Sequence, residues 1–302
     1  MPAISRQRWA TALLFLTPAL WAVNYLVARR APGVIPPHVL ALLRWGLAGC
    51  ALALGARTEL WAQRRHLLRD WKHYLVLGAL GMWICGAWVY VGARTTTALN
   101  ISLIYALSPV LIAAASAAWL KERLDRWQIT GIALALTGVL HVVLKGEWAA
   151  IATVQWVAGD LWILAATVSW AGYSLLLKKW PSPLSPAGRL AAISLAGVLV
   201  LLPFALWEAA SSATPVLTST GLVLAVVAAI FPGYLAYLAY SVMQRELGAA
   251  RVSVVLYLGP LYAAALGWLA LDEALHLFHA VGMLLVLPGI YLVTRAHKAG
   301  SR

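Results

Sequence analysis

Hydrophobic residues come in blocks of about 20 along the chain, separated by short stretches that carry charged residues, proline or glycine. An α-helix needs a block of that length to cross the hydrocarbon layer of a bilayer. A backbone in lipid must satisfy its own hydrogen bonds, and these continuous blocks are too long for barrel strands. The pattern therefore predicts ten membrane-spanning helices. The predicted spans are residues 9–28, 37–56, 74–93, 98–119, 127–144, 157–177, 187–207, 219–243, 252–271 and 276–294.

Composition supports a polytopic membrane protein. Of the 302 residues 63% are hydrophobic and 11% are charged, and the mean hydropathy is +0.82. A soluble domain carries about twice that charged fraction. The net charge of +13 lies mostly between the apolar blocks, so we attribute it to membrane topology and expect no nucleic-acid partner. Cys50 and Cys85 lie inside apolar blocks without metal-ligand spacing, and we expect neither a metal nor a cofactor.

Basic residues are distributed unevenly between the two sides of the predicted membrane. The N-terminus and the connections after even-numbered spans hold 18 of the 23 Lys and Arg residues, the other side holds four, and Arg44 lies within a span. By the positive-inside rule both termini are cytoplasmic. The first block is full length and lacks an early small-residue cleavage site, so we expect no cleavable signal peptide. We expect the chain to lie in the inner (plasma) membrane of the cell.

The second half of the chain repeats features of the first. Both halves contain a Pro–Glu–Gly–Gly frame, and a shift of 151 positions superimposes one copy on the other. The first copy is Pro109, Glu122, Gly131 and Gly138, and the second is Pro260, Glu273, Gly282 and Gly289. A shift of 149 positions places Trp21 on Trp170 and Asn24 on Tyr173. Residues 1–150 and 151–302 thus each hold five predicted spans, and because five is odd the second half enters the membrane from the opposite side. Inverted halves are typical of secondary transporters, whose site lies at the repeat interface; the alternative is a duplicated scaffold without a transport role.

With this frame and the "LLRWGLAG" of the second span, the chain resembles EamA-type members of the drug/metabolite transporter superfamily. The resemblance covers essentially the whole chain. It implies ten helices around a central cavity lined by spans 1–4 and 6–9, with spans 5 and 10 at the periphery. Members of the family move small metabolites and often export amino acids. The aromatic-rich helices look most like those of bacterial exporters of aromatic and other neutral amino acids.

Several polar and aromatic residues within spans are candidates for lining such a cavity, because polar groups in lipid tend to face a cavity or a partner helix. Trp21 and Asn24 share one helical face, and Asn24 offers a donor and an acceptor to a zwitterion. We place Trp170 and Tyr173 in the cavity as their counterparts. The alternative for Asn24 is a hydrogen bond between helices.

Aromatic and proline positions supply the other candidates. Tyr234, Tyr237 and Ser241 form a stripe next to Pro232, where a helix can break, and their counterparts in span 3 include Trp83 and Tyr90. Spans 4 and 9 add two similar sets, in which each proline frees a backbone carbonyl and predicts a hinge. These sets are Ser102, Tyr105 and Pro109, and Ser253, Tyr257 and Pro260. The alternative for the stripe is packing or an interfacial belt.

Arg44 is the only basic residue well inside a predicted span. A buried guanidinium stays charged and can fork onto the carboxylate of an amino acid. The alternatives are contacts with helix carbonyls, or extension toward the outer face. Every Asp and Glu lies in a connection or near a span end, so no mid-membrane acid is available as a proton relay, and we expect facilitated transport.

These features predict a carrier and not an enzyme. The chain has no H-E-x-x-H, G-x-S-x-G or P-loop pattern. We expect export of small neutral metabolites, best exemplified by amino acids including aromatic ones, by alternating access. An exporter of lipophilic cations is the alternative in the same architecture, and an intramembrane enzyme or a channel is the alternative outside it. The expected partners are the small-molecule substrate and the lipid bilayer. The sequence leaves the oligomeric state open, and a monomer is compatible with it.

Overall fold

The computed structural model describes residues 3–121, 124–271 and 274–295, and every regular element in these ranges is a helix. Glu122 and Glu273 of the repeated frame lie outside the described residues. The first half contains α1 (Ala3–Arg30), α2 (Pro37–Gly55), α3 (Arg57–Ala62), α4 (Arg64–Arg69), α5 (Trp71–Gly78), the π-helix η1 (Ala79–Ile84), α6 (Cys85–Gly92), α7 (Ala98–Tyr105), α8 (Ser108–Trp119) and α9 (Arg126–Val143). The second half contains the 3₁₀ turn η2 (Trp148–Thr153), α10 (Ala158–Lys179), α11 (Pro186–Ser211), α12 (Ser219–Ala228), the π-helix η3 (Ala229–Leu235), α13 (Ala236–Leu247), α14 (Ala249–Ser253), the 3₁₀ turn η4 (Val254–Leu258), α15 (Gly259–Leu271) and α16 (Leu277–Arg295).

Eight helical stretches of the described chain are long and apolar enough to cross a membrane, and each coincides with a predicted span. The predicted spans 9–28 and 252–271 fall on α1 and on α14 to α15, where the apolar stretches Ala12–Ala28 and Ala249–Tyr262 are shorter. The chain is thus an all-helical, multi-pass membrane protein, and the count of ten spans stays a prediction.

Four spans are interrupted near their middle. The spans Trp71–Gly92 and Ser219–Leu247 each contain a π-helical segment, η1 and η3, which begin 150 positions apart in the chain. In η3 the interruption contains Pro232, which has no N–H to donate and therefore weakens the regular helical ladder. The helix ahead of Pro109 breaks between α7 and α8, and the one ahead of Pro260 tightens into η4. These interruptions free backbone carbonyls close to the centre of the molecule.

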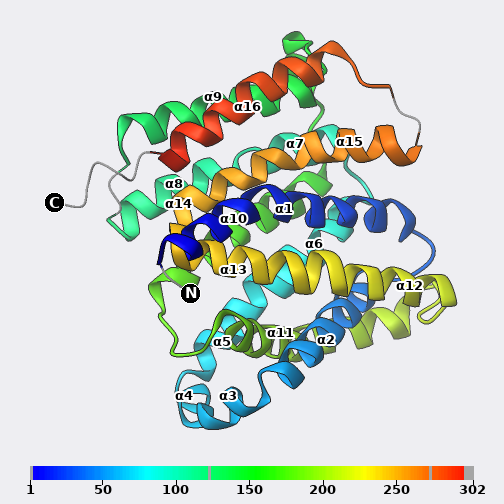
Figure 1. The fold of residues 1–302 in the computed structure, drawn as a ribbon. Coiled ribbons are helices and arrows are strands. Elements are labelled where there is room, and N and C mark those ends of the chain that lie inside the picture. Colours follow the sequence, from blue (N-terminus) through cyan, green and yellow to red (C-terminus); the bar gives the residue numbers. More distant parts are fainter. Residues whose placement is uncertain (1–2, 122–123, 272–273, 296–302) are drawn as a thin grey trace.

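The helices form a bundle with two outer pairs. Figure 1 shows α9 and α16 side by side at one edge, α2 and α11 at the other, and α1, α6, α10 and α13 between them. The α9–α16 pair is close because glycines face each other: a Cβ on Gly131 would lie 2.5 Å from the carbonyl oxygen of Gly289, and one on Gly138 2.9 Å from that of Gly282. The glycines of the repeated frame therefore allow two helix backbones to touch.

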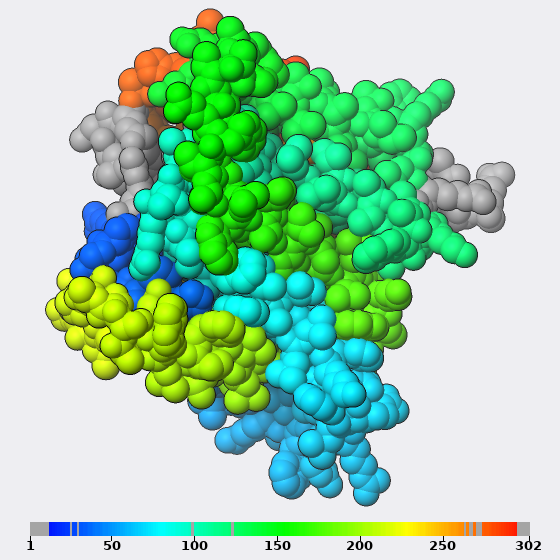
Figure 2. All heavy atoms as spheres, turned by 180° about the vertical axis from the view of Figure 1, so that it is seen from behind, coloured from blue at the N-terminus to red at the C-terminus, as the bar shows by residue number. Residues whose placement is uncertain are grey.

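Several helices begin or end at one end of the bundle. There α1 begins and α16 ends (Figure 1), and the short helices α3 and α4 form a projecting corner, also visible from behind (Figure 2). The C-terminal turns of α10 and α13 end there with Lys178, Lys179 and Arg245. We call this the basic end of the bundle.

Candidate functional site

A cavity of about 230 Å³ lies among the central helices, and we call it the central cavity. It is lined from α1, α2, α6, α7, α8, α10, α13, η4 and α15. It reaches toward the end opposite the basic end, where Ala28, Ala93 and Ile101 line it. Val139 of α9 also lines it, whereas α11 contributes no lining residue in the described chain, in contrast to what the family resemblance implied. The physical reason is that α11 packs behind α2 and α5, where Gly78 and Gly197 come into close contact.

Arg44 places a cation in the wall of this cavity, with only 4% of its surface exposed. Its Nη2 donates to the carbonyl oxygen of Pro232 at 3.1 Å, and its Nη1 lies 3.5 Å from Oδ1 of Asn24. The guanidinium carbon lies 4.7 Å from the centre of the Trp45 ring. No salt bridge joins Arg44 to an acidic residue in the described part of the chain. A guanidinium buried without a counter-ion is costly, and an anionic ligand in the cavity would compensate it.

Further hydrogen-bond donors surround Arg44. The Nε of Arg44, the indole N–H of Trp170 and the hydroxyl of Tyr257 are buried and have no partner within the described residues. Asn24 uses its oxygen to accept from Tyr90 at 2.6 Å, which leaves its NH₂ group available as a donor. The described lining residues include no Asp or Glu. The described cavity wall therefore holds donors without partners and no carboxylate, a composition that suits an anionic group.

Aromatic rings close the cavity on the side of the basic end. Trp21 lies 5.7 Å from Trp170 and 5.5 Å from Tyr240, measured between ring centres, and Trp170 lies 5.4 Å from Tyr237. Most of these contacts are edge-on or tilted, the geometry that aromatic pairs prefer. Tyr237 also reaches across to Trp45, at 4.7 Å. These rings offer an apolar face to a ligand whose polar head lies at Arg44.

The structure brings together part of the residue set expected from the sequence. Residues of that set that line the central cavity are Trp21, Asn24, Arg44, Ser102, Tyr105, Trp170, Tyr237, Tyr257 and Pro260. Residues of that set outside its lining are Trp83, Tyr90, Tyr173, Tyr234, Ser241, Ser253, Pro109 and Pro232.

Most of the outlying residues have identifiable contacts. Trp83 stacks on Phe204 at 4.2 Å, and Tyr173 is fully buried behind Trp170. The Ser253 hydroxyl donates to the carbonyl oxygen of Ala250 at 2.7 Å, so it is occupied by its own helix. Tyr234 lies inside the π-helix η3, whose wider turn breaks the regular spacing with Tyr237. Two of the outlying residues, Tyr90 and Pro232, contact the cavity residues Asn24 and Arg44.

Sequence reasoning missed Tyr240 and Cys85. Tyr240 falls off the helical stripe of Tyr237, yet it is fully buried among the closing rings and its hydroxyl lies 3.0 Å from that of Ser174. The sequence indicated its place only through the spacing of three residues from Tyr237, which puts the two rings near each other on the helix surface. Cys85 lines the cavity from the start of α6, and its lack of a metal-ligand pattern gave no reason to include it.

Asp160 lies outside the cavity lining and holds two segments together at the start of α10. Its carboxylate accepts from Nδ2 of Asn100 at 2.9 Å, from the backbone N–H of Val157 at 2.8 Å, and from the hydroxyl of Thr96. The carboxylate is thus fully hydrogen-bonded and stabilises a helix N-terminus.

Comparisons with known proteins agree with this architecture. The chain is 27% identical to a probable terminal-alkyne amino-acid exporter of Streptantibioticus cattleyicolor, covering 97% of this chain and 94% of that protein. It is 26% identical to an S-adenosylmethionine/S-adenosylhomocysteine transporter of Chlamydia trachomatis, covering 92% and 87%, and 28% identical to the transporter YyaM of Bacillus subtilis, covering 88% and 87%.

A solved crystal structure has the same fold, with a TM-score of 0.76 at 22% identity over 95% of this chain and 96% of that one. The model of the EamA-like transporter family matches residues 8–144 and 157–295. The chain belongs to the EamA-like transporter family, within the drug/metabolite transporter superfamily.

Proposed function

We propose that this protein is a secondary transporter that exports small metabolites with a zwitterionic head, best exemplified by amino acids including aromatic ones. The observation that carries the proposal is the pairing of an unneutralised guanidinium with an aromatic wall in one cavity. Arg44 and the unpartnered donors suit the substrate carboxylate. Trp21, Trp170 and Tyr237 suit an apolar side chain, and their ring faces also attract an ammonium group.

The relatives support the same chemistry. Two of the relatives reported above are named with a substrate, as a probable terminal-alkyne amino-acid exporter and as a transporter of S-adenosylmethionine and S-adenosylhomocysteine. All of these molecules carry an α-ammonium and an α-carboxylate. The head group that they share is the part that we assign to Arg44 and Asn24.

Alternating access between two inverted halves, residues 1–150 and 151–302, is the proposed mechanism. It is supported by the family matches in each half and by the two π-helical segments 150 positions apart. Interruptions at Pro109, Pro232 and Pro260 are the proposed hinges, because a break in the helical ladder lets the two parts of a span tilt. The basic end is the proposed cytoplasmic side of the inner membrane, with both termini on it.

Proton coupling through a buried acid is not part of the proposal. The described lining of the cavity contains no carboxylate, and Asp160 is occupied as a helix cap. We therefore propose facilitated transport. A transport rate that rises steeply with an imposed proton gradient would contradict it.

The deciding experiment is counterflow in proteoliposomes. Vesicles preloaded with unlabelled phenylalanine are expected to accumulate labelled phenylalanine transiently, which a carrier does and a channel does not. The double variant Trp21→Ala with Asn24→Ala is expected to abolish the signal. Trp207→Ala is the matched control, because Trp207 is 71% exposed on α11 and does not line the cavity.

The same vesicles test the alternative of a lipophilic-cation exporter. Uptake of tetraphenylphosphonium without amino-acid counterflow would support that alternative and overturn the proposal. The buried guanidinium of Arg44 predicts the opposite result, since it repels a cation in a cavity without a carboxylate.

A further inference from the structure

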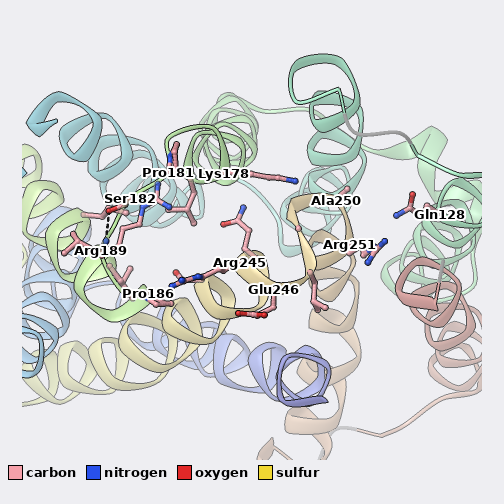
Figure 3. A pocket seen from close by; sticks show the side chains of 18 of the residues that line it. Gln128, Lys178, Pro181, Ser182, Pro186, Arg189, Arg245, Glu246, Ala250 and Arg251 are labelled. Atoms are coloured by element: carbon pink, nitrogen blue, oxygen red, sulfur yellow. Dashed lines mark hydrogen bonds between the residues drawn. The ribbon is translucent and has the colours of Figure 1, made fainter. Parts of the chain in front are cut away.

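A second and larger pocket, of about 830 Å³, opens at the basic end, and we call it the basic pocket. It lies between the ends of α10 and α13 and the starts of α9, α11 and α14. Figure 3 shows Lys178, Arg189, Arg245 and Arg251 around it, with Arg251 on the side of Gln128. It shares no lining residue with the central cavity.

The charge of this pocket is positive. Four cations line it, Lys178, Arg189, Arg245 and Arg251, against the two acids Asp125 and Glu246. Asp125 is engaged as the cap of α9, where it accepts from the N–H of Gln128 at 2.9 Å. A concave site lined mainly by one sign of charge raises the local concentration of the opposite ion.

Two polar atoms in the wall of the pocket are buried without a partner. The Nε of Arg189 has none, although its Nη2 donates to the carbonyl oxygen of Trp180. Gln244 is 5% exposed, and its Oε1 has no partner within the described residues. A buried polar group without a hydrogen bond is costly, and a ligand with both acceptor and donor atoms would relieve both. An amino-acid head group has both.

The basic pocket continues the central cavity along the same two helices. On α10, Trp170 lines the cavity and Lys178, eight residues later, lines the pocket, with Ser174 between them. On α13 the same spacing separates Tyr237 from Arg245. Positions four and eight apart lie near one face of a helix, so the line from one space to the other, here called the path, runs along the same faces of α10 and α13.

A fully buried contact interrupts this path. The hydroxyls of Ser174 and Tyr240 lie 3.0 Å apart, and Nε2 of Gln244 donates to the carbonyl oxygen of Ser174 at 2.6 Å. Ser174 and Tyr240 have no exposed surface. The contact joins α10 to α13 and separates the two spaces.

We propose that the basic pocket is a second binding site for the transported molecule, which holds its carboxylate before the Ser174–Tyr240 contact opens and Arg44 takes it over. This inference rests on the proposed function. It assigns the substrate class more narrowly, as molecules with a carboxylate, because cations at both sites repel a substrate that carries only positive charge.

The test compares phenylalanine with phenylalaninamide, which has the same side chain but no carboxylate. The variant is Lys178→Gln with Arg245→Gln, two exposed cations that line the pocket. The matched control is Lys179→Gln with Arg126→Gln, which removes two exposed cations outside the lining. Half-saturation for phenylalanine at the basic end is expected to rise about tenfold in the variant, with an unchanged maximal rate, and to stay unchanged in the control. Half-saturation for phenylalaninamide is expected not to rise in the variant, since the removed cations repel its ammonium group, and to stay unchanged in the control.

A second measurement does not depend on transport. With both native cysteines replaced by alanine, Ser241→Cys places one thiol in the basic pocket. Phenylalanine is expected to slow its labelling by a charged maleimide, and the slowing is expected to disappear in the Lys178→Gln, Arg245→Gln background. Protection by phenylalaninamide equal to that by phenylalanine would overturn the proposal.

The outcomes separate the two proposals. Phenylalanine counterflow with equal half-saturation in variant and control would overturn the second site and leave the proposed function in place. Absence of counterflow in the unmodified protein would remove the proposed function itself. A variant effect that appears in phosphatidylglycerol vesicles and vanishes in phosphatidylcholine would assign the basic pocket to a lipid headgroup, and would also overturn the proposal.

Discussion

The α9–α16 pair and the central cavity are built from the same two halves of the chain in opposite ways. At the pair, the two halves contribute equivalent residues: Gly131 meets Gly289, and Gly138 meets Gly282. At the cavity, the equivalent pair Trp21 and Trp170 is kept, but other equivalent positions differ. Arg44 has no basic equivalent at a shift of 149 to 151 positions, where the chain reads Ile193, Ser194 and Leu195.

The difference follows from what each region has to do. Two helices that only need to touch can use one solution twice, because a glycine facing a backbone works equally in either half. A bound amino acid has a charged head at one end and a side chain at the other, so it requires unlike walls. Tyr237 and its counterpart Gly86 both line the cavity, and the missing side chain at Gly86 makes room for Trp45, whose Nε1 would lie 2.9 Å from a Cβ there. The repeated glycines therefore indicate the scaffold, and departures from the repeat, such as Arg44, indicate where the site is asymmetric.

The largest effect of a single substitution is expected at Arg44, which has no basic equivalent in the other half of the chain. Arg44→Gln keeps hydrogen-bonding capacity but removes the charge, and Arg44→Lys keeps the charge but removes the fork. We expect Arg44→Gln to lower the ratio of maximal rate to half-saturation for phenylalanine roughly 10- to 100-fold, since a charge-assisted hydrogen bond contributes about 1.5–3 kcal/mol. The ratio for Arg44→Lys should lie between those of the unmodified protein and of Arg44→Gln. Counterflow at graded phenylalanine concentrations measures both.

Arg64→Gln provides the control for that experiment, because Arg64 lies at the surface and contacts the carbonyl oxygen of Trp61. An equal loss for phenylalanine and phenylalaninamide in Arg44→Gln would mean that Arg44 supports the fold of the cavity and does not bind a carboxylate.

In the α9–α16 pair we expect a substitution to change the stability of the protein and not its transport. A methyl group at Gly131 would lie 2.5 Å from a backbone oxygen, whereas one at Gly46 would meet nothing within 4 Å. Gly131→Ala is expected to cost about 1–3 kcal/mol of folding free energy and to lower the melting temperature in detergent by about 3–10 °C. Gly46→Ala should leave the melting temperature unchanged or raise it, because alanine stabilises a helix more than glycine does.

Exchange by the Gly131→Ala protein, measured well below its melting temperature, is expected to keep the half-saturation of the unmodified protein. A changed half-saturation would break the division between scaffold and site, because it would couple the α9–α16 contact to the cavity.

A smaller effect is expected at the residue that orients Asn24. Tyr90→Phe removes the 2.6 Å hydrogen bond to Oδ1 of Asn24 and lets the amide rotate. A neutral hydrogen bond contributes about 0.5–1.5 kcal/mol, so half-saturation for phenylalanine should rise about 2- to 10-fold. Tyr262→Phe is the control, because Tyr262 lies in α15 and does not line the cavity. Equal half-saturation in both variants would mean that the amide orientation of Asn24 has no part in binding.

The sequence predicted the helices better than it predicted which of their faces line the cavity. Spans follow from the length of apolar blocks, a property that each block carries by itself. The face that a residue occupies depends on helix rotation, and the π-helical segment η3 changes that rotation next to Tyr234. Trp83 and Phe204 stack between helices that are distant in the chain, a contact that no local pattern records. Arg44 could be identified because a cation inside an apolar block stands out in the sequence whatever the rotation of its helix.

The smallest effect is expected at Tyr257, and it separates binding from folding. Its hydroxyl is buried in the cavity wall without a partner in the described chain, so the empty protein gains nothing from it. Tyr257→Phe should therefore leave the melting temperature of the ligand-free protein unchanged or slightly higher. Half-saturation for phenylalanine should rise about 2- to 5-fold if the hydroxyl bonds the substrate, since one neutral hydrogen bond is then lost. Thermal denaturation with and without phenylalanine measures both quantities in one series. A lower melting temperature in the ligand-free variant would show that the hydroxyl stabilises the fold. The polar atoms without partners would then no longer distinguish the wall of the cavity from the packed interior around it.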